Sequence, residues 1–497
     1  MKSVFSAFVF ILISTQAHAA EYLVKYKNQK AFARLQEMAA VKSSGLSVRD
    51  VHQPGSFMVV DIQTKNEAAT VGELLSAPDI EWVNPNFELK AFEAPFDKAK
   101  LKEQWGMAKV QAQKAWERAG NRGSRGVIVA VIDTGVDYHH KNLAANAIPG
   151  YDFNGNDEDP MDEVGRANKG HGTHCAGVIG ATGVVDDGVV GLSPDVSIMP
   201  VRFLGANGSG NLADGIKAID FAIEKGAHVI SASWGASVRR ATATALIEAV
   251  KRASDKGVIF VAAAANDGRS NDKTDVFPAN ANFENTITVA ASNSNDGKPS
   301  WSNYGKSTVH VASPGEGIMS TIPNDEYVSM SGTSMATPLV AGAVALLKAQ
   351  DPTLTGAQIR ALLQTTGVKA NIETACNCRI DAFAAVDHLL SRRPWMVPAA
   401  ATMNAKETQD ITMMNANGAV TYVSSDPAVL TVDANGLVTA VANGTARITA
   451  TDAAGHTAGT LDFDVKGGGA GKPECPVSSE TICRGICWLF PRLGFCQ

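Results

Sequence analysis

The stretch Ser331-Gly332-Thr333-Ser334-Met335-Ala336-Thr337-Pro338 is the most informative part of this chain of 497 residues. A turn of small residues leads directly into an apolar run, residues 339–347, which is typical of a buried helix with Ser334 in its first turn. A hydroxyl at that position lies beside the unpaired N–H groups of the helix end, where negative charge is stabilised. Nucleophilic serines need such a position, because attack on a carbonyl creates an oxyanion. Ser334 is therefore a candidate nucleophile, and a simple helix cap is the alternative interpretation.

Two further segments supply a base and an acid. Residues 127–132 predict a strand buried on both faces of a parallel sheet, and the strand ends in Asp133. His171 lies between two glycines, just before a small apolar segment that predicts a helix over 176–181. Functional groups gather at the carboxyl ends of strands in open α/β sheets. The chain order Asp133, His171, Ser334 is one of the known orders of a serine triad, and it favours catalysis over three separate structural roles.

These motifs resemble those of the subtilisin-like serine endopeptidases, and the resemblance extends over about residues 105–390. It implies an α/β catalytic domain with a parallel sheet in three layers. It also implies that Ser334 attacks the scissile carbonyl, that His171 is the general base and that Asp133 orients His171. The second histidine of that motif, His174, is expected to be structural.

The same resemblance assigns the oxyanion hole and the substrate-binding edges. Asn266 follows a predicted strand over 259–265 and is expected to donate to the oxyanion together with the N–H of Ser334. The expected substrate-binding residues are Ser233, Trp234 and Gly235 on one edge, Gly208 on the opposite wall, and Ala264 and Ala265 at the specificity pocket. Ala265 stands where the family usually has glycine, so its methyl group is expected to narrow that pocket. Ordinary sheet ends are the alternative interpretation of these edges.

The insert over 152–163 carries clustered carboxylates on a loop rich in glycine and asparagine. Such a loop suits Ca²⁺, with Asp152, Asp157 and Asp162 as candidate ligands, and a solvated acidic loop is the alternative. A second calcium site of the family is not predicted, because Asn142 replaces its usual aspartate. Catalysis itself is expected to need no cofactor.

The N-terminus predicts export. Residues 1–19 combine a positive start, a short apolar run and an Ala-x-Ala end, which is the pattern of a secretory signal. The run is too short to span a bilayer, and no later stretch reaches the roughly 18 uninterrupted apolar residues of a transmembrane helix. A secreted protein without a transmembrane segment is therefore expected.

Residues 20–98 predict a small α+β domain, with strands over 21–26 and 57–62, a last strand from Ile80, and helices over 29–40 and 70–75. Its ending, Trp82-Val83-Asn84-Pro85-Asn86, resembles the inhibitory pro-domain of subtilisins. The chain is thus expected to be its own intramolecular inhibitor, with a processing junction between Phe92 and Glu103 and a catalytic domain over 99–392. A separate regulatory domain is the alternative.

The C-terminal part predicts a different architecture. Residues 398–466 alternate in short runs separated by turn signals, which is typical of a β-sandwich, and they resemble a bacterial immunoglobulin-like module. Surface or substrate anchoring and a purely stabilising role are both open for it. A glycine-rich linker (467–472) leads to a tail (473–497) with four cysteines. These allow three disulfide pairings, zinc binding being the weaker alternative. Cys376 and Cys378 pair with each other or with partners elsewhere, and Cys175 remains as the odd cysteine.

Composition and charge limit the classes of partner that the chain is expected to bind. The net charge of −6 and the lack of a basic stripe argue against nucleic acid. The function predicted from the sequence is a secreted, autoprocessed serine endopeptidase that acts on proteins and peptides through an acyl-enzyme. The alternatives are a surface-binding or adhesive protein, in which the C-terminal modules carry the function, and an esterase that uses the same triad.

Overall fold

The computed structural model describes residues 20–40, 45–63, 67–92, 104–183 and 188–467. Within these ranges the chain forms two compact units, which meet in the sequence between Asn86 and Phe87. The predicted secretory signal, the residues directly after Phe92 and the cysteine-rich tail lie outside the described residues. In the described ranges, no helix combines the length and the apolar character needed to cross a bilayer.

The N-terminal unit has the predicted α+β pattern. Its elements are β1 (Ala20–Tyr26), α1 (Gln29–Ala40), β2 (Leu46–His52), β3 (Phe57–Ile62), α2 (Glu67–Ser76) and β4 (Ile80–Pro85). The strands form an antiparallel sheet in the order β2-β3-β1-β4, and apolar side chains of both helices pack against it. The sequence did not predict β2, because polar Arg49 and Asp50 interrupt its alternation at an irregular register.

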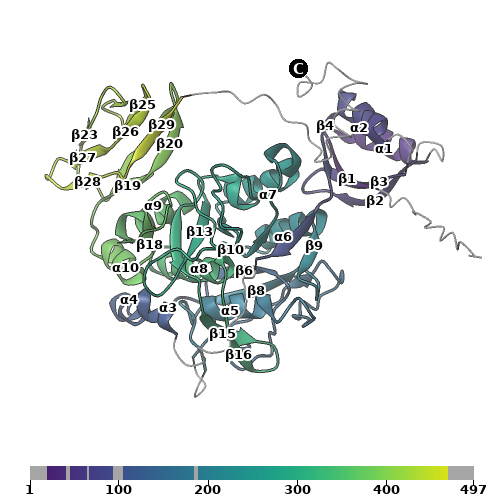
Figure 1. The fold of residues 1–497 in the computed structure, drawn as a ribbon, viewed down its shortest axis with the longest axis horizontal. Helices are drawn as coiled ribbons and strands as arrows, with labels where there is room; N and C mark the ends of the chain where they lie inside the picture. Colours follow the sequence, from purple (N-terminus) through teal and green to yellow (C-terminus); the bar gives the residue numbers. More distant parts are fainter. Residues whose placement is uncertain (1–19, 41–44, 64–66, 93–103, 184–187, 468–497) are drawn as a thin grey trace, which may run out of the picture. The chain divides into compact units, whose positions relative to one another are not determined.

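The second unit is built on a sheet of nine strands whose central strands are parallel, as the sequence predicted (Figure 1). In sheet order they are β17 (Val368–Lys369), β18 (Cys378–Arg379), β14 (Val311–Pro314), β13 (Thr286–Ser292), β12 (Ile259–Ala263), β10 (Val229–Ala232), β6 (Ile128–Asp133), β8 (Ser197–Arg202) and β7 (Tyr151–Asp152). The central strands are almost wholly buried, because helices cover both faces of a parallel sheet.

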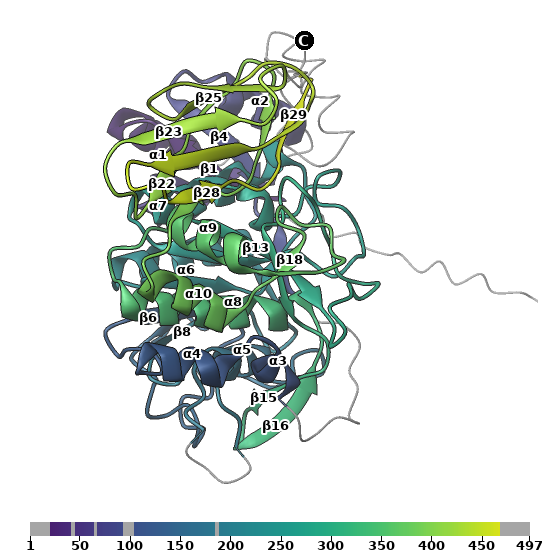
Figure 2. The same cartoon turned by 90° about the vertical axis from the view of Figure 1, so that its left-hand side faces the viewer.

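Helices complete a three-layer α/β arrangement. One face of the sheet packs against α5 (His171–Gly180) and α8 (Thr333–Gln350), with α9 (Gly356–Thr366) and α10 (Ala382–Leu390) beside α8 (Figure 2). The other face packs against α6 (Leu212–Glu224) and α7 (Thr244–Asp255). The remaining helical segments are α3 (Trp105–Lys109), α4 (Ala112–Ala119), η1 (Arg240–Ala243) and η2 (Ala279–Ala281). The carboxyl ends of β6, β10 and β12 meet at one edge, where the predicted functional residues follow.

Two small sheets lie outside the main one. A three-stranded sheet contains β5 (Glu88–Ala91) between β9 (Ser209–Asn211) and β11 (Trp234–Gly235). A hairpin is formed by β15 (Ile318–Ile322) and β16 (Glu326–Met330). The sequence analysis includes β5 in the pro-domain, whose last strand is expected in the substrate-binding cleft, and in the structure β5 pairs with β9 and β11 of the second unit.

The C-terminal part of this unit forms short sheets consistent with the predicted immunoglobulin-like sandwich (Figure 1). Its strands are β19 (Trp395–Val397), β20 (Ala401–Asn404), β21 (Thr408–Asp410), β22 (Thr412–Met414), β23 (Val420–Ser424), β24 (Leu430–Val432), β25 (Leu437–Ala440), β26 (Gly444–Ala446), β27 (Ile448–Asp452), β28 (Thr457–Gly459) and β29 (Phe463–Lys466). Alternate side chains of β19 enter two cores: Trp395 packs in the core of the α/β part, and Met396 packs in that of the sandwich. One strand therefore belongs to both cores.

Cys376 and Cys378, whose pairing the sequence left open, form a disulfide with each other. Cys175 is buried and is not part of this disulfide.

Candidate active site

Asp133 and His171 form a buried pair. Asp133 is the last residue of β6, and His171 is the first residue of α5, which begins earlier than the helix that the sequence predicted. The Asp133 Oδ1 lies 2.7 Å from the His171 Nδ1, and each side chain is about 1% exposed. A neutral His171 that donates from Nδ1 to this carboxylate has its Nε2 as the proton acceptor. The pair therefore has the geometry of a base with an orienting acid.

Glycine at position 172 makes this pairing possible. A β-carbon on Gly172 would lie 2.1 Å from the Gly135 carbonyl oxygen and 3.0 Å from the Asp133 β-carbon. The first contact is closer than packed atoms allow, and the second is tight. Any larger residue would push the start of α5 away from Asp133.

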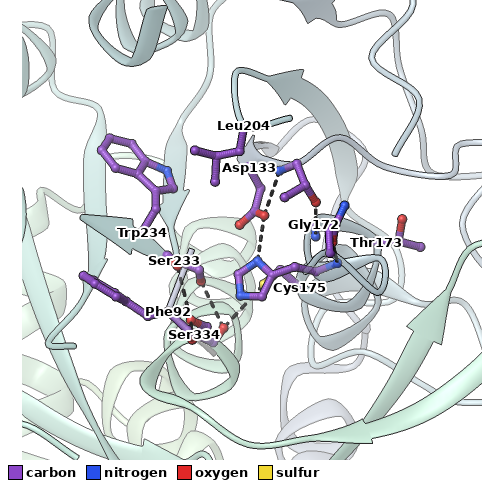
Figure 3. A network of polar contacts seen from close by, with 12 residues as sticks. Phe92, Asp133, Gly172, Thr173, Cys175, Leu204, Ser233, Trp234 and Ser334 are labelled. Atoms are coloured by element: carbon purple, nitrogen blue, oxygen red, sulfur yellow. Dashed lines mark hydrogen bonds and ion pairs between the residues drawn. The ribbon is translucent and has the colours of Figure 1, made fainter. Parts of the chain in front are cut away.

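Ser334 lies in the first turn of α8, and Pro338 shapes that turn. Proline has no N–H, so Pro338 cannot donate to the Ser334 carbonyl one helical turn earlier. That oxygen instead accepts from the Ser233 hydroxyl at 3.0 Å and from the Cys175 thiol at 3.4 Å. The helix start is thereby bonded to the residue that follows β10 and to the middle of α5. Figure 3 shows Ser334, Ser233 and Phe92 together at one side of the cluster, with Asp133 at the other.

The Ser334 hydroxyl does not cap its helix. The N-cap is Gly332, which has no capping side chain, and the Ser334 Oγ hydrogen-bonds to carbonyl oxygens instead. One of them belongs to Phe92, and the other is the Ser233 oxygen at 3.2 Å. The helix-cap interpretation from the sequence is therefore wrong.

Asn266 is held so that its amide nitrogen faces the same place. Its Oδ1 accepts from the N–H and from the hydroxyl of Thr333, both at 2.9 Å, which fixes the orientation of the amide. The buried Nδ2 has no hydrogen-bond partner within the described ranges. A β-carbon on Gly332 would lie 2.8 Å from the Phe92 carbonyl oxygen, 3.2 Å from the Asn266 Nδ2 and 3.5 Å from the Ser334 nitrogen. Two N–H donors and one carbonyl oxygen thus surround a single point.

A segment of the chain itself lies along the predicted substrate-binding edges. β5 pairs with β9 on one side and with β11 on the other, both antiparallel. At the end of the strand, the Ala91 N–H donates to the Gly208 oxygen, and the N–H of the next residue, Phe92, donates to the Ser233 oxygen, each at 3.1 Å. A β-carbon on Gly235 would lie 2.9 Å from the Phe92 ring, so glycine there leaves room for an aromatic side chain. An added peptide strand is a known way of binding an extended substrate.

The remaining predicted substrate residues are buried. The Trp234 Nε1 donates to the Ile132 oxygen at 2.7 Å, which connects β11 to β6. Ala264 and Ala265 are buried; the Ala265 N–H donates to the Thr333 hydroxyl at 3.2 Å, and its oxygen accepts from the Asn303 N–H at 2.9 Å. Ala265 has φ of 87°, in the left-handed region that disfavours a β-carbon.

We expect Ala265→Gly to stabilise the protein. Relief of the left-handed strain contributes about 1–2 kcal/mol, and the extra backbone entropy of glycine offsets about 0.5–1 kcal/mol of it. The melting temperature should therefore rise by about 1–2 °C. Melting is best measured in a Ser334→Ala background, which prevents self-digestion. The neighbouring Ala264→Gly is the matched control, and it should lower the melting temperature because Ala264 has no positive φ; equal effects at both positions would contradict the strain argument.

The three carboxylates proposed for calcium do not form one ligand set. Asp152 pairs with the buried Arg202 at 3.0 Å, and the same guanidinium bonds Glu163 at 2.7 Å. Asp162 is buried, and its carboxylate accepts hydrogen bonds from three neighbouring side chains. In the part of the chain that the structure describes, one group of three residues has potential metal-ligand atoms that all lie within 4.8 Å of one another, and it consists of Asp133, His171 and Cys175. Calcium binding by this loop stays a prediction, since Arg202 compensates the charge of Asp152 while the carboxylates of Asp152 and Asp157 both lie near Gly155.

His174 is structural, as the sequence predicted. Its Nε2 lies 3.0 Å from the Ile318 oxygen and 3.2 Å from the Val328 oxygen, so it links α5 to the β15–β16 hairpin. Burial, together with the nearby charge of His171, lowers the pKa of His174 to about 3. It is therefore neutral at ordinary pH and serves as a hydrogen-bond donor.

Three participants were not identified from the sequence. Phe92 appeared only as a limit of the processing junction, whereas its carbonyl contacts Ser334. Thr333, which orients Asn266, was seen as a turn residue, and Asp162 as a metal ligand. Thr333 directly precedes the candidate nucleophile, and this position in the sequence is the signal that could have identified it. For Asp162 no local signal distinguishes a buried acceptor from a loop carboxylate.

Comparison with known proteins agrees with this geometry. Residues 124–420 match the Subtilase family, and residues 396–461 match the group 2 bacterial Ig-like domain. The chain is 39% identical over 331 residues to a thermophilic serine proteinase of Bacillus sp. (strain AK1), covering 66% of this chain and 78% of that protein. It is 39% identical over 287 residues to thermitase of Thermoactinomyces vulgaris (57% and 96%), and 38% identical over 265 residues to subtilisin Savinase of Lederbergia lenta (53% and 90%).

Proposed function

The chain belongs to the subtilase family of serine endopeptidases, and we propose that it is a secreted zymogen whose triad is Asp133, His171 and Ser334. The observation that carries the proposal is the contact between the Ser334 hydroxyl and the carbonyl of Phe92, a peptide carbonyl that lies beside two N–H donors.

Acylation follows from these positions. The Ser334 Oγ attacks the carbonyl carbon while the His171 Nε2 takes the hydroxyl proton, and the carbonyl oxygen becomes an oxyanion. The Asn266 Nδ2 and the Ser334 N–H donate to it, and Asp133 stabilises the imidazolium. His171 then gives its proton to the leaving amine as the C–N bond breaks, which leaves an ester on Ser334. Water, deprotonated by His171, hydrolyses this ester and restores the serine.

A peptide substrate is favoured over a small ester. β5 makes backbone hydrogen bonds on both sides, to β9 and β11, over several residues before the contacted carbonyl. A small ester has no backbone to pair with these edges. The direct test is hydrolysis of a denatured protein by the full chain, and failure to cleave it would refute the proposal.

Self-processing is proposed at the bond between Phe92 and Glu93. The Phe92 carbonyl is the one beside Ser334, and β5 occupies the cleft as a substrate strand. This arrangement supports residues 20–92 as the released pro-segment, which inhibits as long as β5 remains bound.

We expect Phe92→Asp to slow the release of this segment by about 10²-fold, because a carboxylate beside Gly235 would lose its hydration next to apolar surface. The measurement is the mass of the processed chain against time, together with the N-terminal residue of the mature form, which should be Glu93. Phe92→Leu is the matched control, and it should process at nearly the wild-type rate. A mature N-terminus other than Glu93, or a rate of release in Phe92→Asp equal to that of the wild type, would contradict this junction.

Secretion is proposed from the signal-like pattern of residues 1–19 and is supported by the Cys376–Cys378 disulfide, since such bonds persist in oxidising compartments. Surface or substrate anchoring is proposed for the immunoglobulin-like module, whose match covers residues 396–461.

A further inference from the structure

One buried carboxylate connects the two sides of the Asp133–His171 pair. The Asp162 Oδ1 accepts from the Thr134 hydroxyl at 2.9 Å and from the Asn168 amide at 2.8 Å. Its Oδ2 accepts from the N–H and the hydroxyl of Thr173, at 2.9 Å and 2.6 Å. Asp162 is 4% exposed, so protein groups rather than water provide these four bonds.

Each donor is adjacent to the candidate pair. Thr134 directly follows Asp133, and its hydroxyl oxygen accepts from the Gly172 N–H at 2.9 Å, the residue after His171. The Asn168 Oδ1 accepts from the N–H of His171 itself, also at 2.9 Å. The network therefore joins the end of β6 to the first turn of α5.

Burial of the Asp162 carboxylate costs free energy, and packing alone does not explain why a carboxylate occupies this position. Burial raises the pKa of Asp162 to about 6, although all four hydrogen bonds act to lower it. No ion pair to Asp162 occurs in the described part of the chain, and a buried unpaired carboxylate is normally unfavourable. A carboxylate is, however, the one side chain that accepts four donors at once with two oxygens.

We propose that Asp162 is a positioning residue for the Asp133–His171 pair, acting in its ionised form through Thr134, Thr173 and Asn168. The proposal rests on the triad assigned above. Protonation or amidation would turn one of its acceptors into a donor that faces another donor, and the start of α5 would shift relative to Asp133.

The test is Asp162→Asn in the full chain, with kcat and KM measured on a peptide substrate after processing. We expect kcat to fall by about 10–100-fold with KM nearly unchanged, the range found when partners behind a reacting group are removed. Asp220→Asn is the matched control, since Asp220 is also buried but bonds Arg252 between α6 and α7. It should affect the melting temperature and leave kcat unchanged.

The pH profile separates positioning from a merely structural role. The ionisable groups around Asp162 are Asp133 on β6, His171 on α5, the neighbouring Glu163–Arg202 pair, and Asp137, whose N–H donates to Thr173. Protonation of Asp162 near pH 6 should add one proton to the acid limb of the wild-type pH profile, which should therefore be steeper than the acid limb of Asp162→Asn. In Asp162→Asn, the acid limb of the pH–activity profile should have the slope that uptake of a single proton gives.

Thr134 provides a second route if Asp162→Asn fails to fold. Thr134→Ser keeps the hydroxyl and should retain kcat, whereas Thr134→Val should lose it to a similar extent as Asp162→Asn. A folded Asp162→Asn variant with kcat within about twofold of wild type, or with the same acid limb, would overturn the inference. An inactive wild type, or an active Ser334→Ala variant, would instead refute the proposed function.

Discussion

Ser334→Ala is expected to lower kcat against a denatured protein by about 10⁴–10⁶-fold and to leave the chain unprocessed at Phe92. The methyl group cannot attack a carbonyl, and the residual activity is that of water in a site that still has its donors. Because the Ser334 backbone bonds to Ser233 and Cys175 do not involve the hydroxyl, the fold should be kept. The variant is therefore a stable zymogen, and its mass reports directly on self-processing.

The matched control is Ser313→Ala. Ser313 is a fully buried serine on β14, and its hydroxyl has no partner among the residues that the structure describes. Its removal should leave both kcat and processing unchanged, although the size of the substitution is the same. Wild-type processing and hydrolysis by Ser334→Ala would show that another residue is the nucleophile, and the triad assignment would then be abandoned.

The fold was predictable because its signals are local and repeated. Buried strands such as residues 128–133 show as continuous apolar runs, and α1 occupies the range predicted from periodicity. β2 was missed because Arg49 and Asp50 interrupt its pattern. The start of α5 was missed because glycines around His171 suggest a loop, whereas close packing against Gly135 and Asp133 requires a glycine inside the helix.

The site was predictable as a set of residues but not as a set of contacts. Asp133, His171, Ser334 and Asn266 stand at element ends in the sequence, yet the partners that orient them are distant or ambiguous. Asp162 is the clearest case: among acidic neighbours its composition suggests a cation, and only tertiary contacts reveal that hydroxyl and amide donors surround it. Likewise Arg202, far from the acidic loop in sequence, forms ion pairs with Asp152 and Glu163 of that loop, which no pattern in the sequence indicates.

Asn266→Asp is expected to lower kcat by about 10²–10³-fold with little change in KM, because the removed donor acts on the oxyanion rather than on the ground-state carbonyl. Aspartate keeps the size of the side chain and keeps one oxygen for the Thr333 N–H and hydroxyl, so the local packing is preserved. Its second oxygen replaces the Nδ2 that lies beside the Phe92 carbonyl, and it opposes the developing negative charge.

The comparison with Asn266→Leu separates the two functions of this amide. Leucine removes the donor without adding charge, but it also leaves two Thr333 donors without their acceptor, at about 1–3 kcal/mol of stability. If the amide acts on the oxyanion, kcat should fall in both variants, whereas the melting temperature should fall only in Asn266→Leu. Thr333→Ser, which keeps the hydroxyl, should retain activity. An Asn266→Asp variant with kcat within about tenfold of wild type would mean that the Ser334 N–H alone stabilises the oxyanion, and the two-donor arrangement around Gly332 would then have no catalytic role.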